Sequence, residues 1–481
     1  MKYIILLLIT PLFLNAQQFN GRHIKLHIKS LKNSKMYLGT YYEKKRIVAD
    51  STLIDQNGNG AFYNKQKFTQ GVYFLVTPSL NALQDFIIGP EQEFLIEGDT
   101  SFNEPIKIAG SPDNDLFLKY NDYMNEKGKS MKDIEISYSE AGVFNDSNER
   151  RKNLVMQYNA VNREMKLYRE KLVKDNPDAF LSMLLNVSKR PEVPAIPIIN
   201  GKPDSTYPYR YIKAHFWDET EFNDDRLIRT PFFEEKIDEY FDRLVPKDPD
   251  SIIKEVRFIM AYARSNKEMF SYFLNKFTNK FWFPKYLGED KVFIFLFENY
   301  FSKGDTVYVT AESRKNVRER YFKLVGNYVG NKSVPINLKD TSGAPISLYN
   351  IQAPLILLVF YNPTCGHCRT QIPRVDSFYK ANWKSKRVVI FAINVNKEIP
   401  VWKDFIKEFK LKGWYNGYEP DEDEIAEAKQ GRSFRQAYNI HSTPLFFLLD
   451  KDKRIIGKEL SLEQYDDLIN VMTKKYNNNP N

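Results

Sequence analysis

The two cysteines of this 481-residue chain, Cys365 and Cys368, lie together in the run Cys-Gly-His-Cys. No other residue of the chain carries a thiol. A disulfide that closes so short a loop removes little conformational entropy from the unfolded chain, so structural stabilisation is a poor explanation for the pair. The spacing therefore indicates two cysteines that are used for chemistry.

The residues around the pair predict where it lies in a fold. Residues 355–361 form a continuous apolar run, which is typical of a strand buried on both faces. Residues 362–364, Asn-Pro-Thr, follow as a turn. Apolar residues then recur at helical spacing, at Ile372, Val375, Phe378 and Tyr379. Cys365 is therefore expected at a strand-to-helix junction, at the N-terminus of the helix.

This position has a chemical consequence for Cys365. The first N–H groups of a helix have no partner within the helix, and the helix dipole is positive at this end, so both favour a thiolate. The thiolate is the attacking species in disulfide exchange, which makes Cys365 the predicted nucleophile. Cys368 lies about one turn further on the same face, where it can resolve a mixed disulfide. Between them, Gly366 and His367 are candidates for tuning the redox couple, because a protonated His367 would stabilise the thiolate.

Metal binding is the main alternative for the pair. A structural zinc site needs four ligands, and the chain offers no further cysteine and five histidines. Copper held by Cys365, Cys368 and one histidine is the sharper form of this alternative. We expect no metal ion and no cofactor.

A second motif lies downstream of the cysteines. Residues 442–444, Ser-Thr-Pro, lead directly into the apolar run 445–449, and residues 454–458 form a partner strand after a short turn. Proline is confined to the starts and edges of strands, so Pro444 marks the first residue of a strand.

The order of these elements resembles a thioredoxin domain, and more specifically the exported TlpA/ResA-like thiol–disulfide oxidoreductases. The resemblance covers about residues 332–477. It rests on the strand, the CxxC pair, the helix and the Thr443-Pro444 motif. It rests also on a hairpin over 336–348, a strand over 387–395 and helices over 401–410 and 462–474.

The resemblance implies roles for individual residues. Cys365 would be the exposed nucleophile, and Cys368 the buried resolving thiol. Thr443-Pro444 would be a cis peptide that leaves the preceding backbone free to pair with an extended substrate segment. Pro373 matches the proline that kinks the active-site helix of the family.

Three residues depart from the family pattern. Thr364 replaces the usual tryptophan before the first cysteine, Val359 stands where many thioredoxins carry a buried acid, and Gln371 replaces a common glutamate. The usual carboxylate proton acceptors for Cys368 are therefore missing. Gly366-His367 resembles the disulfide isomerase pattern, whereas the overall resemblance favours a reductant.

Three functions consequently remain open. We expect a thiol–disulfide oxidoreductase that acts on proteins, in the direction of a reductant. An oxidant or isomerase of the same fold is the first alternative. A ligand-binding protein with a regulatory redox pair is the second.

The start of the chain predicts export. Met1-Lys2 is a short basic segment, residues 4–14 are apolar but too few to span a bilayer, and residues 14–16 offer a cleavage site. Residues 1–16 are thus expected to be a cleaved signal peptide, which places the mature chain in the periplasm or elsewhere outside the cytoplasm, where disulfides persist. The expected partners are cysteine-containing exported proteins and a membrane electron donor. The oligomeric state is left open by the sequence.

The net charge does not indicate a nucleic-acid partner. Lysine and arginine exceed aspartate and glutamate by 9, but the excess is spread along the chain without a long basic run. A solvated surface explains this distribution, and we expect no nucleic acid to bind.

The remaining chain predicts two further modules, so the fold class is a multidomain protein. Residues 17–110 alternate between polar and apolar and contain turn signals, which indicates an all-β, sandwich-like module. Residues 111–331 predict an all-α domain, and residues 332–481 the α/β thioredoxin fold. His23 and His27 share one face of a predicted strand, where packing or solvent contact is a better explanation than a metal site.

Apolar stripes at helical spacing support the central helical prediction. The first stripe runs from Leu154 to Leu172, with a capping box of Asp146 and Glu149 at its start. Three more stripes follow between residues 233 and 277. Such stripes indicate packing rather than a cofactor pocket. A proline-rich stretch over 191–208 is expected to be a connector, with a lid over a groove as the alternative.

Overall fold

A computed structural model describes residues 21–100, 106–140, 149–305, 309–429, 431 and 433–478. The predicted signal peptide, residues 1–16, and Asp146 of the predicted capping box lie outside these ranges. The chain divides into two compact units, Met1–Leu244 and Val245–Asn481, which are described separately. The module limits at residues 110 and 331 stay predictions.

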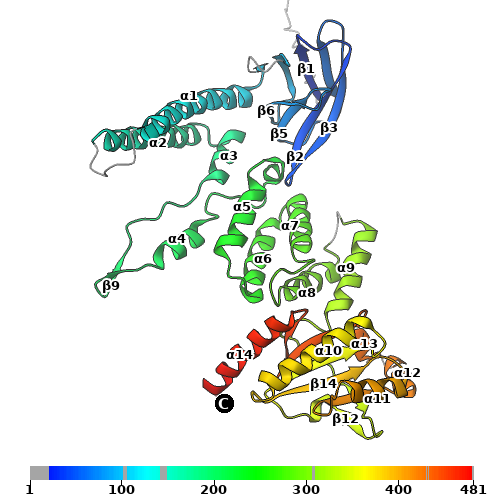
Figure 1. Ribbon diagram of the computed structural model, residues 1–481. Helices are drawn as coiled ribbons and strands as arrows, with labels where there is room; N and C mark the ends of the chain where they lie inside the picture. Colours follow the sequence, from blue (N-terminus) through cyan, green and yellow to red (C-terminus); the bar gives the residue numbers. More distant parts are fainter. Residues whose placement is uncertain are drawn as a thin grey trace, which may run out of the picture. The chain divides into compact units, whose positions relative to one another are not determined.

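The first unit begins with two four-stranded sheets, in the orders β4-β1-β7-β8 and β3-β2-β5-β6 (Figure 1). The strands are β1 (Arg22–Ile28), β2 (Ser34–Tyr42), β3 (Lys45–Ile54), β4 (Asn59–Asn64), β5 (Gly71–Val76), β6 (Ala82–Ile88), β7 (Glu93–Gly98) and β8 (Lys107–Ala109). Along β1, Ile24, Leu26 and Ile28 are buried, whereas the residues between them are not. Inward side chains of both sheets form one core, so the module is a β-sandwich, as the alternation predicts.

Helices cover the edge of the second sheet. Asn114, in the first turn of α1 (Pro112–Glu140), is fully buried, and its side-chain amide bonds both the N–H and the carbonyl of Ile87 in edge strand β6, at 2.7 and 2.8 Å. The side chain thereby satisfies backbone groups that an edge strand would otherwise expose. Phe180 and Leu184 of α3 (Phe180–Ser188) pack against Ile87.

Helices α1 and α2 (Glu149–Asp175) form an antiparallel pair (Figure 1). The rings of Tyr123 and Tyr168 stack with centroids 4.0 Å apart, and Lys127 pairs with Glu164 at 2.6 Å. In the predicted apolar stripe of α2, Leu172 is buried and the other members are half-buried. The stripe packs against a single partner helix, so most of its side chains stay partly exposed to solvent.

The rest of the first unit is irregular and helical. The proline-rich stretch carries a short hairpin, β9 (Ile198–Ile199) and β10 (Lys202–Pro203). It is followed by α4 (Tyr207–His215), the 3₁₀ turn η1 (Asp225–Arg229), α5 (Phe233–Glu239) and the π-helical turn η2 (Tyr240–Leu244).

Four helices open the second unit: α6 (Pro249–Ala263), α7 (Lys267–Lys280), α8 (Asp290–Asn299) and α9 (Ala311–Leu324), with a 3₁₀ turn η3 (Phe301–Lys303). The predicted stripes over 252–263 and 269–277 are the buried faces of α6 and α7. At the start of α8, the carboxylate of Asp290 lies 2.6 Å from the ammonium of Lys458 in strand β17, and both side chains are buried. The four helices are therefore tied to the domain that follows them.

A seven-stranded mixed sheet forms the centre of the C-terminal domain, in the order β12-β11-β15-β14-β13-β16-β17. The strands are β11 (Asn337–Lys339), β12 (Pro345–Ser347), β13 (Leu355–Tyr361), β14 (Val388–Asn394), β15 (Tyr415–Tyr418), β16 (Leu445–Asp450) and β17 (Ile455–Lys458). Strands β13, β14 and β15 run parallel, and β16 and β17 continue the sheet antiparallel. All seven residues of β13 are buried, as expected of the central strand.

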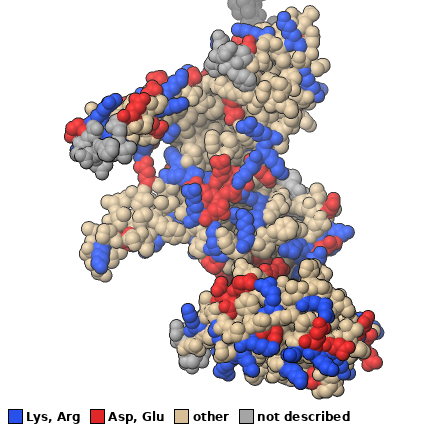
Figure 2. Space-filling model, in the orientation of Figure 1, with Lys and Arg blue, Asp and Glu red and all other residues tan. Residues whose placement is uncertain are grey.

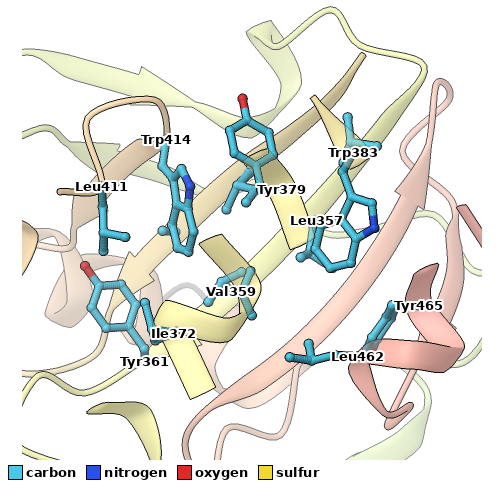
Figure 3. Close-up of a cluster of buried hydrophobic side chains, with 14 of the residues drawn as sticks. Leu357, Val359, Tyr361, Ile372, Tyr379, Trp383, Leu411, Trp414, Leu462 and Tyr465 are labelled. Carbon is cyan, nitrogen blue, oxygen red and sulfur yellow. The ribbon is translucent and has the colours of Figure 1, made fainter. Parts of the chain in front are cut away.

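Helices cover both faces of this sheet. Odd-numbered residues of β13 pack against one face, formed by α10 (Gly366–Phe378), η5 (Tyr379–Trp383), α11 (Ile399–Glu408) and α14 (Leu462–Asn478). Figure 3 shows this core, with Leu357, Val359 and Tyr361 of the strand opposite Ile372. Even-numbered residues face α13 (Phe434–Ala437) and the 3₁₀ turn η4 (Leu348–Asn350).

The fold class predicted from the sequence is confirmed: β-sheets, then helices, then an α/β domain of thioredoxin type. Strand β15 and helix α12 (Asp421–Lys429) are additions that the sequence did not predict. Across the described residues, no helix combines the length and apolar character needed to cross a bilayer.

Candidate functional site

Cys365 lies at the junction of strand β13 and helix α10. It is the N-cap residue of α10, with an extended backbone (φ −78°, ψ 124°), and its N–H donates to the carbonyl of Asn362 at 3.1 Å. This junction arises because the buried strand ends at Tyr361 and the Asn-Pro-Thr segment turns the chain before the helix begins. The predicted position of Cys365 at a helix N-terminus is therefore confirmed.

The two thiols differ in exposure and in acidity. Cys365 is half-buried, whereas Cys368 is completely buried in the core beneath the helix. The pKa of Cys365 is lowered, chiefly because the backbone N–H of Cys368 donates a hydrogen bond to its sulfur. Burial raises the pKa of Cys368 to about 11. Cys365 is therefore the more acidic of the two thiols.

The Thr443-Pro444 segment faces the half-buried thiol. The peptide between Thr443 and Pro444 is cis, as the resemblance implied. The sulfur of Cys365 lies 3.5 Å from the carbonyl oxygen of Thr443, although the two residues are 78 positions apart. The structure thus brings the two predicted motifs together. The role of Thr443 and Pro444 in holding a substrate stays a prediction.

Gly366 and His367 occupy the first turn of α10, and both are exposed. Their predicted role in redox tuning stays a prediction. Arg369, the residue after Cys368, forms an ion pair with Glu408 of α11. Its guanidinium is thereby partly neutralised.

The surroundings of Cys368 are apolar, as Val359 and Gln371 indicated. Val359 is fully buried in the same core as Cys368. Nearby, the buried hydroxyl of Tyr361 accepts a hydrogen bond of 2.8 Å from the indole of Trp402.

A polar cluster beside the cysteines was missed by the sequence analysis. Asn362 follows strand β13, Asn394 is the last residue of the neighbouring parallel strand β14, and Asn396 follows that strand. The side chain of Asn396 donates to that of Asn362 at 3.0 Å, and the backbone N–H of Asn362 donates to the sulfur of Cys368 at 3.4 Å. The carboxyl ends of parallel strands meet at one edge of a sheet, and this rule could have revealed the cluster.

Metal-binding geometry is not seen in the described part of the chain, where no three His, Cys, Asp or Glu side chains gather as a metal site would require. His27 instead bonds the side chain of Asn59 at 2.9 Å. His23 lies edge-on to the ring of Tyr63, with centroids 5.5 Å apart.

Charges are interspersed on the visible face of the C-terminal domain. Figure 2 shows basic and acidic side chains side by side over the domain that Figure 1 colours yellow to red. On this face the net positive charge of the chain does not gather into a basic patch.

Family models match three segments of the chain. Residues 354–455 match a thioredoxin-like family, residues 23–117 match a domain of unknown function (DUF4369), and residues 152–322 match another (DUF5106). No curated protein matches the chain in sequence.

Several solved structures are similar to parts of the chain. A thioredoxin-like protein from Bacteroides caccae is 23% identical over 59% of this chain and 99% of its own, with a TM-score of 0.41. A domain of a "possible thiol-disulfide isomerase" from Cytophaga hutchinsonii is 29% identical over 31% of this chain and 96% of its own, with a TM-score of 0.27. The thioredoxin domain of a thiol-disulfide oxidoreductase from Bacteroides vulgatus is 23% identical over 30% and 97%, with a TM-score of 0.27.

The family match and the strand order of the sheet agree with the motifs that carried the resemblance. The C-terminal part of this chain is therefore a thioredoxin-like domain, and the recognition of a TlpA-like domain in the sequence is confirmed.

Proposed function

We propose that this chain is an exported thiol–disulfide oxidoreductase that reduces disulfides in other exported proteins. The observation that carries the proposal is the arrangement of Cys365, with its lowered pKa and partial exposure, directly above the buried Cys368. A nucleophile must be accessible and ionised, and a resolving thiol must be shielded from other partners. The exposure of the two thiols and the directions of their pKa shifts agree with these roles.

In the proposed reaction, the thiolate of Cys365 attacks one sulfur of a substrate disulfide. The substrate S–S bond breaks, its second sulfur leaves as a thiolate and takes a proton from water, and a mixed disulfide remains at Cys365. Cys368, after losing its proton, attacks the sulfur of Cys365. This step forms the Cys365–Cys368 bond and releases the substrate fully reduced.

The peptide around Thr443 would hold the substrate during this exchange. Its carbonyl lies 3.5 Å from the sulfur of Cys365, so a substrate strand that pairs with this backbone would present its disulfide to the thiolate. After each cycle the protein holds a disulfide, and an electron donor at the membrane would restore the two thiols.

The direction of the reaction has a specific rival. His367 is exposed in the first turn of α10, where its protonated form would stabilise the thiolate of Cys365 and make the couple more oxidising. Equilibration with glutathione separates the two directions. A reduction potential near −270 mV, about that of thioredoxin, supports a reductant, and a value of roughly −180 to −120 mV supports an isomerase or oxidant.

Substitution of each cysteine tests the activity itself. Cys365→Ser should abolish the reduction of insulin by the full-length protein with dithiothreitol as electron source. Cys368→Ser should retain the first attack and accumulate mixed disulfides with substrate proteins. Ser377→Ala is a matched control, because Ser377 lies on the same helix and its hydroxyl bonds only to the carbonyl of Pro373 among the described residues.

Full activity of Cys365→Ser would refute the proposal. A ligand-binding protein with a regulatory pair would instead trap few or no partners through Cys368→Ser. Sequencing the N-terminus of the protein secreted by a bacterial host tests export, and cleavage after Ala16 is the expected result.

A further inference from the structure

We propose that Asn362 and Asn396 are positioning residues that hold the backbone N–H of Asn362 against the sulfur of Cys368, where it stabilises the resolving thiolate. The inference rests on the proposed function, since it concerns the second step of the exchange. It addresses a difficulty of this site: Cys368 must ionise inside an apolar core, and the carboxylates common in related domains are replaced by Val359 and Gln371.

The N–H of Asn362 is placed to act on the sulfur. It lies 3.4 Å from the sulfur of Cys368, within the range of a hydrogen bond to sulfur. The backbone carbonyl of Asn362 accepts a hydrogen bond from the N–H of Cys365 at 3.1 Å. Asn362 therefore contacts both cysteines through its backbone. A hydrogen bond to an ionised group is about twice as strong as one between neutral groups, so the donor favours the thiolate over the thiol.

Side chains fix Asn362 in this place. Its side-chain carbonyl accepts three hydrogen bonds: from the N–H of Thr364 at 3.0 Å, from the hydroxyl of Thr364 at 2.9 Å, and from the amide of Asn396 at 3.0 Å. A carbonyl that satisfies three donors from two segments of the chain cannot rotate without losing them. The orientation of the Asn362 backbone is thereby set by residues beyond its own turn.

Asn396 is itself anchored on the neighbouring strand. Its N–H donates to the side chain of Asn394 at 3.0 Å, and its carbonyl accepts from the amide of Asn394 at 2.7 Å. Asn394 is buried at the last position of β14, and the side-chain carbonyl of Asn396 accepts from the N–H of Glu398 at 2.7 Å. The chain of bonds therefore runs from the rigid sheet to the sulfur of Cys368.

The N–H of Asn362 acts on the second step of the exchange, in which Cys368 attacks the mixed disulfide at Cys365. The proton of Cys368 goes to water, the Cys368 sulfur supplies the electron pair of the new S–S bond, and the substrate sulfur leaves with the pair of the broken bond. Suppose that loosening the donor raises the pKa of Cys368 by about one unit. The thiolate fraction falls about tenfold, the more basic thiolate is about threefold more nucleophilic, and resolution slows about threefold.

The aromatic disulfide dithiobis(nitrobenzoate) measures the two steps in one trace. Reduced protein releases one coloured nitrothiolate when Cys365 attacks, at a rate proportional to the reagent. It releases a second when Cys368 resolves the mixed disulfide, at a rate independent of the reagent. The full-length Asn396→Ala variant should slow the second phase about threefold at every pH between about 6 and 9, and leave the first phase unchanged.

Thr364→Val removes a different bond to the same side chain and should also slow the second phase, which keeps the inference testable should Asn396→Ala fold poorly. Ser377→Ala should change neither phase. An unchanged second phase in both tether variants would overturn the inference while leaving the proposed function intact. Absence of any first phase in the wild-type protein would instead overturn the proposed function.

Discussion

Removing one partner of the buried ion pair between Asp290 and Lys458 should strongly destabilise the second unit. The ammonium of Lys458 and a carboxylate oxygen of Asp290 are 2.6 Å apart, and the side chains are 8% and 1% exposed. Lys458 also donates to Asn327 at 3.0 Å, whereas neither oxygen of Asp290 has a well-aligned hydrogen bond among the described residues. The carboxylate therefore depends on the lysine for compensation of its charge.

Lys458→Met should lower the free energy of unfolding by about 3–5 kcal/mol, because it leaves Asp290 buried without a cation. The double variant Asp290→Leu with Lys458→Met removes both charges, and we expect its stability to lie within about 1 kcal/mol of the wild type. The lysine packs at a junction between the helices and the sheet, so the same experiment measures how firmly the helices are attached.

Urea unfolding followed by tryptophan fluorescence is a suitable assay, since four of the five tryptophans, Trp282, Trp383, Trp402 and Trp414, lie in this unit. With a urea dependence of about 2–3 kcal/mol per M, the midpoint should fall by roughly 1–2.5 M. Lys291→Met is the matched control: Lys291 pairs with Asp250 at 2.6 Å, but the side chains are 38% and 77% exposed, so it should cost less than about 1 kcal/mol. Equal effects of Lys458→Met and Lys291→Met would refute the reasoning.

Three further predictions concern acidity and packing. In the Cys368→Ser variant, the rate at which iodoacetamide alkylates Cys365 should level off at a lower pH than for an ordinary thiol. In the Cys365→Ser variant, the alkylation rate of Cys368 should keep rising with pH until about 11. Mass spectrometry follows both rates, and coincident pH profiles would contradict the assigned pKa directions. Lys236 is buried against Phe216 and Trp217, and burial lowers its pKa to about 7. Between about pH 7 and 10.5 the Lys236 side chain is therefore protonated in the unfolded chain and neutral in the folded chain. The free energy of unfolding of the first unit should consequently rise by about 2 kcal/mol from pH 7 to 9. Urea unfolding followed by the fluorescence of Trp217 measures this rise, and Lys236→Met should remove it. Tyr361→Phe leaves the buried indole N–H of Trp402 without its acceptor and should lower the free energy of unfolding by about 1–3 kcal/mol. Tyr415→Phe is the control: Tyr415 is exposed, so this substitution should change the free energy of unfolding by almost nothing.

Local patterns were sufficient to predict most of the elements around the redox pair. The apolar run before Cys365 became the fully buried strand β13, and the apolar spacing after it became α10. Strand β16 begins at Leu445, so Pro444 directly precedes the strand and is not its first residue. The predictions of β13 and α10 succeed because burial on both faces and helical periodicity leave direct traces in the sequence.

Strand β15 shows where local patterns mislead. Asn416-Gly417 in its centre is a turn signal in isolation. In the fold, the amide of Asn416 bonds the carbonyls of Leu411 and Trp414 at 3.0 and 3.2 Å. A Cβ on Gly417 would lie 2.7 Å from the side chain of Leu338, so the close approach of β11 requires glycine. The approach of Leu338 to Gly417 joins residues far apart in the sequence, so it cannot be read from the residues next to Gly417.

The sequence by itself determined that the two cysteines stand in one CxxC motif, that Cys365 begins a helix, and that the usual carboxylates are absent. Each of these facts depends on residues within a few positions of one another. The tertiary structure decided the rest of the site. Thr443 reaches Cys365, and Asn396 reaches Asn362, because parallel and antiparallel pairing brings the ends of β13, β14 and β16 to one edge of the sheet. Contacts between residues tens of positions apart follow from strand order, which local periodicity does not encode.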